Sequence, residues 1–360
     1  MIGLPEIIAG VIAIALNAYA LTGGADFGGG VWDLFATGVR RQRQRDLIAD
    51  SIAPIWEANH VWLIVVVVVL FTAFPAAFSV LATVLHIPLT IMLIGIVLRG
   101  SAFVFRSYGP YGGNRWGLAF AIASVMTPLL LGSIIGSIAT GAVADAAEKV
   151  HVASFTEVFV RPWAAAFPAA VGFFALALFA LLAATYLTVD AQDEELREDF
   201  RTRALAAAAA VFVGAAVALA VAQSGAPRVA IGVIGALLIQ ASTAAAAVTA
   251  IAALWLRHYR LARIATAAQV SLILWGWLIA QYPYLIPPAL TIRNAAAPAV
   301  TLRLLALGLA GGAVILLPSL RYLLRTFKAD QAGPKDPPST SRARASRCAP
   351  RRAPRTEGPR

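Results

Sequence analysis

The residues best suited to chemistry are two carboxylic acids placed within apolar stretches near the start of the chain. Asp26 is flanked by glycines in GGADFGGG, and Glu57 stands at the mouth of SIAPIWEANHVWLIVVVVVLF, residues 51–71. Burying such a group in hydrocarbon is costly unless it finds a partner. An acid at this depth therefore indicates either a structural ion pair or a place on a proton pathway.

Asp26 has a second acid and a candidate partner. Asp33 follows it by seven residues, so both acids fall on nearly the same helical face. Arg99, near the end of a later apolar stretch, is the expected ion-pair partner of Asp26. Gly24 and Gly28 are four residues apart and predict a close helix neighbour. The structural and the proton-transfer interpretations of Asp26 both stay open, and they can coexist.

Glu57 is expected about one turn inside the start of the second helix, because Pro54 suits a first helical turn. There the helix dipole and the unsatisfied amides favour a carboxylate. His60, three residues on, lies on the same side and could exchange a proton with it. Asn59 lies on another face. The pattern predicts a proton entry site, and an interfacial cap with aromatic anchors is the structural alternative.

Haem and metal ligands are poorly represented in the sequence. His86, two residues before Pro88, raises the hypothesis of a haem ligand in the membrane. One histidine without a second candidate at matching depth favours a hydrogen-bonded core histidine instead. The single cysteine, Cys348, lies in a polar tail, which excludes an internal disulfide and a cysteine-ligated metal site. We therefore predict no metal or cofactor site in this chain.

The composition is that of a polytopic membrane protein: 60% of the 360 residues are hydrophobic and only 13% are charged. The first apolar run has no basic flank and continues past the length of a signal peptide, so we expect it to remain as a span. Nine all-α spans are predicted, each near the roughly 20 residues that cross a bilayer. They cover about 6–38, 54–76, 78–101, 115–140, 163–188, 205–223, 229–256, 262–284 and 299–325.

The connections predict the orientation. Those after the first, third, fifth and seventh spans are rich in arginine, so the positive-inside rule places the N-terminus outside and the C-terminus in the cytoplasm. The net charge of +11 follows from these connections and the end of the chain, and nucleic-acid binding is not expected. The connection at 190–203 is expected to be a solvated loop or a short surface helix, and FPAAF a tight antiparallel hairpin.

The end of the chain differs from the rest. Residues 329–360 contain much proline, serine and arginine and almost no large apolar residue, so they are expected to form a disordered cytoplasmic tail. Such a tail could touch anionic membrane lipid. Residues 1–328 are expected to form one transmembrane domain.

The N-terminal third resembles subunit II of cytochrome bd-type quinol oxidases, including the cyanide-insensitive branch. The resemblance is carried by LTGGADFGGGVWDL (21–34), IADSIAPIWEANHVWLI (48–64), FPAAFSVLATVLHIPLTIMLIGIVLRGSAFVFRSY (74–108) and RPWAAAFPAAVGFF (161–174). From the sixth helix onward the match is mainly architectural.

The resemblance implies two four-helix bundles plus a peripheral helix, in a heterodimer with a subunit I of similar fold. In that family, subunit I holds the quinol site and the ligands of haem b and haem d, and O₂ is reduced to water there. Subunit II is an assembly partner that contributes to proton uptake from the cytoplasm. Glu57, Asp26 and Arg99 match the family's motif positions, although many members have Asp where this chain has Glu57.

The resulting hypothesis is subunit II of a quinol:O₂ terminal oxidase of the respiratory chain, in the bacterial inner membrane. Protons would enter near Glu57, with His60 and Asp33 as waystations, while Asp26 and Arg99 organise or extend the route. Small accessory subunits are conceivable partners. The alternatives are a stand-alone proton-coupled secondary transporter and a purely structural scaffold.

Overall fold

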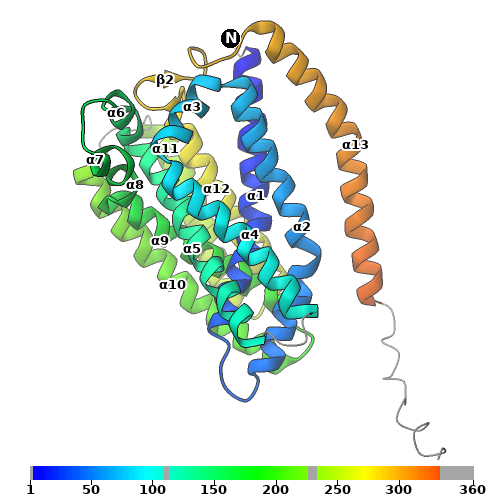
Figure 1. Ribbon diagram of the computed structural model, residues 1–360. Coiled ribbons are helices and arrows are strands. Elements are labelled where there is room, and N and C mark those ends of the chain that lie inside the picture. The colour runs from blue at the N-terminus through cyan, green and yellow to red at the C-terminus, as the bar shows by residue number, and fades with distance from the viewer. Residues whose placement is uncertain (1–2, 109–112, 226–232, 333–360) are drawn as a thin grey trace, which may run out of the picture. The chain divides into compact units, whose positions relative to one another are not determined.

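The computed structural model describes residues 3–108, 113–225 and 233–332, without the side chains of 53–58 and of some residues near other gaps. This part of the chain is almost entirely helical (Figure 1). A small antiparallel hairpin pairs β1 (Tyr284–Ile286) with β2 (Leu290–Thr291). The helices are α1 (Leu4–Leu34), α2 (Arg41–Ala73), α3 (Pro75–Val84), α4 (His86–Tyr108), α5 (Gly113–Thr140), α6 (Ala142–Glu148), α7 (Phe155–Phe159), α8 (Arg161–Ala164), α9 (Ala166–Asp190), α10 (Glu194–Gly225), α11 (Val233–Trp255), α12 (Tyr259–Gln281) and α13 (Ala299–Ala332).

The described helices confirm an all-α polytopic membrane protein. Eight of them are long and apolar enough to cross a membrane on their own. The Asn59–Ala73 part of α2 and the whole of α3 pass the same test together, with a bend of 117° between them, which raises the number of crossings to as many as nine. Large apolar side chains on these helices face outward, with Leu93, Ile94 and Val97 each more than half exposed. Such a surface is suited to apolar surroundings.

Two prolines determine where the second and third predicted spans break. Pro75 is the first residue of α3, and Phe74 before it has left the helical conformation, as residues before proline tend to do. The ring of Pro88 clashes with the carbonyl one turn earlier, so the helix expected over 78–101 is divided at Leu85 into α3 and α4. The predicted hairpin at FPAAF is therefore replaced by a short helix between two turns (Figure 1).

The second helix begins much earlier than predicted. α2 starts at Arg41, in the arginine-rich connection, and continues through Pro54 into the apolar stretch. Arginine, glutamine, leucine and alanine are all good helix formers, so the polar composition of 41–50 does not prevent a helix. The expectation that Glu57 stands one turn inside the helix is wrong, and the favourable dipole argued for it there does not apply.

The connection predicted at 190–203 is mostly helix as well. α9 ends at Asp190 and α10 begins at Glu194, so only three residues separate the two helices. Glu194 and Glu195 occupy the first turn of α10, where carboxylates interact favourably with the helix dipole. The acidic and basic residues of this stretch are therefore held in fixed helical positions.

The long helices pack in two groups, α1, α2, α4 and α5, and α9 to α12, with α1 and α5 meeting α9 between them (Figure 1). The glycines of α1 make this meeting possible. A Cβ at Gly28 would overlap the carbonyl oxygen of Phe179 on α9, and one at Gly24 would come within 2.9 Å of the Phe179 ring. The close helix neighbour predicted from Gly24 and Gly28 is therefore α9.

Two contacts join the segment before α13 to early parts of the chain. The Nε of Arg293 donates a hydrogen bond to Oε1 of Glu6, near the start of α1, at 2.6 Å. The amide of Ala297 donates to the carbonyl of Ala73, the last residue of α2, at 2.8 Å. These bonds lie at the end of the molecule that also carries the β hairpin and α6 to α8 (Figure 1).

The last helix extends past the predicted domain boundary. α13 runs to Ala332, so residues 329–332, predicted as the start of the tail, are helical. The chain divides into two compact units between Gly311 and Gly312. Residues 333–360 lie outside the described residues, and a disordered tail there remains a prediction.

Candidate functional site

Asp26 and Arg99 form a buried ion pair between α1 and α4. The carboxylate of Asp26 is 0% exposed and the Arg99 side chain is 3% exposed. Nη1 and Nη2 of Arg99 each donate a hydrogen bond of 2.7 Å to a different carboxylate oxygen, and Nη2 also donates to the Asp26 carbonyl at 2.8 Å. This paired geometry is the strongest form of an arginine–carboxylate contact. The partner expected for Asp26 from the sequence is the one observed.

Two further helices contribute polar groups to this pair. Asn59 of α2, 0% exposed, donates from Nδ2 to Oδ2 of Asp26 at 2.7 Å. The Nε of Arg99 donates to Oγ of Ser124 on α5 at 2.9 Å, and that hydroxyl donates to the Phe120 carbonyl. We call Asp26, Asn59, Arg99 and Ser124 the buried ion-pair cluster. It connects α1, α2, α4 and α5, so four helices share one set of hydrogen bonds.

Aromatic rings and glycines complete the surroundings of the cluster. The guanidinium of Arg99 lies over the rings of Phe27 and Phe120, with its carbon 4.9 and 4.7 Å from their centroids. Arginine stacks favourably on such faces when water is excluded. A Cβ at Gly30 would overlap the Ser124 hydroxyl, so only glycine lets α5 come this close to α1. The glycine run thus permits the approach that the arginine needs.

The geometry favours a fixed structural role for Asp26 and leaves a proton-transfer role open. Two buried charges are tolerable when they pair with each other and their remaining polar atoms are hydrogen-bonded. The cluster meets that condition at the carboxylate, which accepts from Arg99 and Asn59. It therefore places a compensated charge deep among four helices.

Asp33 lies closer to the end of α1 and is also buried, at 1% exposure. Its Oδ1 is 3.7 Å from Nε of Arg45 on α2, and its carbonyl accepts a hydrogen bond of 3.4 Å from Nη2 of the same side chain. Asp26 and Asp33 of α1 are thus each matched to an arginine of another helix.

The structure describes the other predicted site residues only in part. Glu57 belongs to α2, but its side chain lies outside the described residues. His60 is half-buried on the same helix. Asn59, predicted on another face than Glu57, points to Asp26 and so carries a contact that the sequence did not indicate.

His86 is exposed in the isolated chain, in contrast to the buried core position expected for it. Its Nδ1 lies 2.9 Å from the Thr83 carbonyl, which the break between α3 and α4 leaves accessible, and its ring meets Phe159 edge to face. The described residues include no group of three or more His, Cys, Asp or Glu side chains that could hold a metal ion.

A small cavity adjoins the cluster where α1, α2 and α9 meet. Its volume is about 20 Å³. Its wall is mostly apolar, and the residues that line it include Asp26, Ser51, Tyr186 and Asp190.

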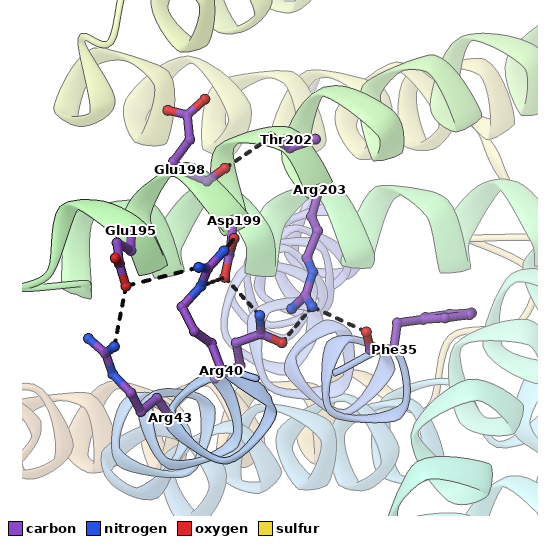
Figure 2. A network of polar contacts seen from close by, with 9 residues as sticks. Phe35, Arg40, Arg43, Glu195, Glu198, Asp199, Thr202 and Arg203 are labelled. Atoms are coloured by element: carbon purple, nitrogen blue, oxygen red, sulfur yellow. Dashed lines mark hydrogen bonds and ion pairs between the residues drawn. The ribbon is translucent and has the colours of Figure 1, made fainter. Parts of the chain in front are cut away.

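A second set of arginine–carboxylate contacts lies where the α1–α2 connection meets the start of α10 (Figure 2). Arg40 donates from Nε and Nη2 to the two oxygens of Asp199 at 2.9 and 2.7 Å. Arg43 donates to Asp193 at 2.6 Å and approaches Glu195 at 3.4 Å. We call these five residues the surface ion-pair network, and the end of the molecule that bears it the arginine-rich end.

The surface ion-pair network holds exposed charged side chains in defined positions. Hydrogen bonding to Asp199, followed by its charge, raises the pKa of Arg40 above the ordinary value, and Asp193 does the same for Arg43. Beside them, Arg203 donates to the Phe35 carbonyl at 3.1 Å and to Gln44 at 2.7 Å, which ties α10 to the end of α1 (Figure 2). Sequence reasoning missed this network because it treated 190–203 as a solvated loop or short surface helix and assigned its acids no partners. A helical spacing of its acids would have been the signal.

Comparison with known proteins gives the context of both sites. The family model for cytochrome bd terminal oxidase subunit II matches residues 4–327. The chain is 27% identical to cytochrome bd ubiquinol oxidase subunit 2 of Bacillus subtilis (strain 168) over 143 residues, which are 39% of this chain and 42% of that protein. It is 29% identical to cytochrome bd-I ubiquinol oxidase subunit 2 of Escherichia coli (strain K12) over 133 residues, 36% of this chain and 35% of that one.

These alignments span less than half the length of either relative. A chain of the bd oxidase structure from Geobacillus thermodenitrificans shares the fold more widely, with a TM-score of 0.73 over 90% of this chain and 98% of that chain, at 21% identity. Because the family model matches nearly all of the part that contains the helices, the assignment covers both sites. The chain belongs to the cytochrome bd terminal oxidase subunit II family.

Proposed function

We propose that this chain is subunit II of a membrane-bound quinol:O₂ oxidoreductase, a terminal oxidase of the aerobic respiratory chain. The observation that carries the proposal is the family match over residues 4–327. In this role the chain pairs with a subunit I in the bacterial cytoplasmic membrane and stabilises it. The exposed apolar side chains of its helices are suited to contact lipid, subunit I and any small accessory subunits.

The redox groups are assigned to subunit I in this proposal. Haem b and haem d need axial ligands, and the histidines here are scattered over different elements. His60 lies on α2, His86 starts α4, His151 precedes α7 and His258 precedes α12. This distribution does not fit a haem held by paired ligands of one chain. Quinol oxidation and O₂ reduction are accordingly reactions of the complex.

The arginine-rich end supports the proposed orientation. Arg40 from the connection after α1 pairs with Asp199 at the start of α10, and Arg257 from the connection after α11 lies 3.5 Å from Glu198. Basic connections that are distant in sequence therefore meet on one side of the molecule. The positive-inside rule makes this side cytoplasmic, with the N-terminus outside and the C-terminus inside.

The contribution of the chain to chemistry is proton uptake from the cytoplasm. Glu57 is the entry acid, with His60 and Asp33 as waystations, and Asp26 with Arg99 organises or extends the route. Asn59 supports a connection between α2 and Asp26, because it donates a hydrogen bond to that carboxylate. Glu57 precedes Asn59 by two residues on the same helix.

The test uses the complex purified with its co-expressed subunit I. A haem d band that is present in the complex and absent from this chain alone supports the oxidase, whereas a haem-free monomer that moves a solute supports a transporter. Glu57→Gln should lower O₂ consumption by at least about tenfold, as expected for the loss of a proton-transfer group, with haem content retained. Glu57→Asp should largely preserve turnover.

The matched control is Glu148→Gln, which neutralises an exposed acid at the other end of the molecule. It should leave O₂ consumption unchanged. Turnover of Glu57→Gln equal to that of this control would contradict the proton-uptake role and favour the scaffold interpretation.

A further inference from the structure

A pocket lies among α6, α7 and α8, at the end of the molecule away from the arginine-rich end (Figure 1). Its volume of about 440 Å³ is within the range of about 300–1,000 Å³ that is usual for small-molecule sites. Two acidic and two basic side chains line it, namely Asp145, Lys149, Glu157 and Arg161. We call this the mixed-charge pocket. It offers a ligand as many carboxylates as cations.

The first acid and base of the mixed-charge pocket do not neutralise each other. Asp145 belongs to α6 and Lys149 caps the end of that helix, four residues on. Opposite charges at this spacing can meet on a helix surface, as Arg197 and Glu194 do on α10 at 2.9 Å. Within the described residues, neither Asp145 nor Lys149 makes an ion pair or a side-chain hydrogen bond. Both side chains are exposed and face a ligand without a competing partner.

The second acid and base are also kept apart. Glu157 caps the start of α7, where its Oε2 accepts hydrogen bonds of 3.3 Å from the amide and the hydroxyl of Ser154. Arg161 follows four residues later but begins a separate short helix, α8. Its guanidinium has no ion pair in the part of the chain that the structure describes. The mixed-charge pocket therefore holds a second cation that is available to a ligand.

The ends of three membrane-crossing helices place the mixed-charge pocket at the edge of the bilayer. α5 ends at Thr140 and α9 begins at Ala166, and both residues line the pocket. The apolar span of α10 ends at Ala222, next to the lining residue Val221. Trp163 of α8 lies beside them in the sequence, and tryptophan is enriched where hydrocarbon gives way to lipid headgroups. The pocket is therefore at headgroup depth.

One side of the mixed-charge pocket is apolar and continues into the membrane. Phe167 and Pro168 of α9 and Val221 of α10 form this side. Val217 and Val213, one and two turns before Val221 on α10, are 48% and 59% exposed. An apolar strip thus leads from the charged residues along α10 toward the hydrocarbon. This combination suits a ligand with a charged head and an apolar chain.

We propose that the mixed-charge pocket binds a phospholipid whose headgroup carries a phosphate and a primary ammonium group, as that of phosphatidylethanolamine does. Lys149 and Arg161 donate charge-assisted hydrogen bonds to the phosphate, and Asp145 and Glu157 accept hydrogen bonds from the ammonium. An acyl chain lies along the valines of α10. This site is independent of the proposed proton uptake.

The balance of charges distinguishes this headgroup from others. An anionic headgroup such as that of phosphatidylglycerol brings no cation for the two carboxylates, which then remain without partners beside its phosphate. The quaternary ammonium of phosphatidylcholine has no N–H group to donate to them. A primary ammonium is attracted by its charge and also donates hydrogen bonds, so the pocket should prefer phosphatidylethanolamine over both.

The first experiment uses the complex purified with its co-expressed subunit I and stripped of lipid in detergent. It is titrated with phosphatidylethanolamine, phosphatidylcholine or phosphatidylglycerol of identical acyl chains, and native mass spectrometry counts the bound lipids. The double variant Lys149→Gln, Arg161→Gln should bind one fewer tightly held phosphatidylethanolamine than the parent, with haem content unchanged. Lys149→Arg keeps the charge and should bind as the parent does.

The matched control is Glu148→Gln, because this exposed acid belongs to α6 but does not line the mixed-charge pocket. It should leave lipid binding unchanged. If the double variant binds as many phosphatidylethanolamine molecules as this control does, the inference is overturned.

The second experiment tests the recognition of the ammonium group. Asp145→Asn removes one of its acceptors, so it should weaken phosphatidylethanolamine several-fold at the site that the double variant abolishes, while phosphatidylcholine and phosphatidylglycerol bind as before. Equal weakening of all three lipids would show that Asp145 only shapes the pocket, and the assigned headgroup would be wrong. Free phosphoethanolamine should bind far more weakly than the lipid. Equally tight binding of this soluble zwitterion would overturn the assignment of a lipid.

Discussion

Arginine meets carboxylate in two regions of this chain, at nearly the same distance and in very different surroundings. Arg99 and Asp26 are 2.7 Å apart with side chains 3% and 0% exposed, whereas Arg43 and Asp193 are 2.6 Å apart with side chains 50% and 55% exposed. Water and salt screen the exposed pair, and its net contribution to stability is small. The buried pair is shielded from water, so each charge depends on the other to offset the cost of its burial.

The two regions therefore depend on their partners to different degrees. In the buried ion-pair cluster, Asn59 and Ser124 supply hydrogen bonds from two further helices, and the position of α1, α2, α4 and α5 is coupled through one guanidinium. In the surface ion-pair network, Arg40 and Arg43 each have more than one acid within 4.0 Å. A lost contact can be replaced by water at the surface and by nothing equivalent inside.

The largest effect is expected from removing one partner of the buried pair. Arg99→Gln leaves the Asp26 carboxylate without its compensating charge and should lower the free energy of unfolding by about 3–5 kcal/mol. The melting temperature and yield of the purified complex measure this loss. Combining it with Asp26→Asn removes both charges and should recover part of the stability.

Asp26→Asn alone sharpens the interpretation of that residue. Loss of the assembled complex would favour its structural role, whereas an assembled complex with slowed turnover would favour proton transfer. A melting temperature of Arg99→Gln equal to that of the parent would mean that burial does not distinguish the two regions.

An intermediate effect on stability is expected from replacing Gly30, the glycine that lets α5 approach α1 at the buried ion-pair cluster. A Cβ at Gly30 would overlap the Ser124 hydroxyl, so Gly30→Ala should push α5 from α1 and cost about 1–3 kcal/mol. Gly10→Ala in the same helix is the matched control, since a Cβ there meets nothing within 4 Å. Thermal unfolding of the two variants should differ clearly, and equal melting temperatures would show that α5 can yield without loss.

The smallest effect is expected from the exposed pair. Arg43→Gln breaks the contacts to Asp193 and Glu195 and should shift the melting temperature by roughly a tenth of the shift caused by Arg99→Gln. High salt should remove even this difference, because it screens exposed charges. A shift that survives high salt would indicate that the network is shielded from solvent in the complex.

The sequence predicts the helices of this protein well because their length and hydropathy are set by the membrane. The helix ends are harder to predict. The starts of α2 and α10 lie in polar, charged stretches whose helix-forming residues extend the spans at the arginine-rich end. Composition left a loop or a short surface helix open in 190–203, whereas Glu194–Arg203 form the start of the long helix α10.

Only part of the candidate site could be predicted from the sequence, because some of its contacts depend on how the helices pack. The pairing of Asp26 with Arg99 follows from type and depth alone, since a buried acid requires a cation and few are available. The contributions of Asn59 and Ser124 depend on how α2 and α5 are rotated about their axes, which one sequence does not specify. The cavity that reaches Asp190 depends on three helices at once, so no pattern along the chain could indicate it.

The contacts of Arg293 with Glu6 and of Ala297 with Ala73 can form only late in the synthesis of the protein. A ribosome releases the start of α1 and the end of α2 into the membrane long before it reaches residue 293. During synthesis, Glu6 and the Ala73 carbonyl must therefore wait for more than half of the protein to be translated. These two hydrogen bonds can form only after almost every span has been inserted. They therefore join helices that are already in the membrane.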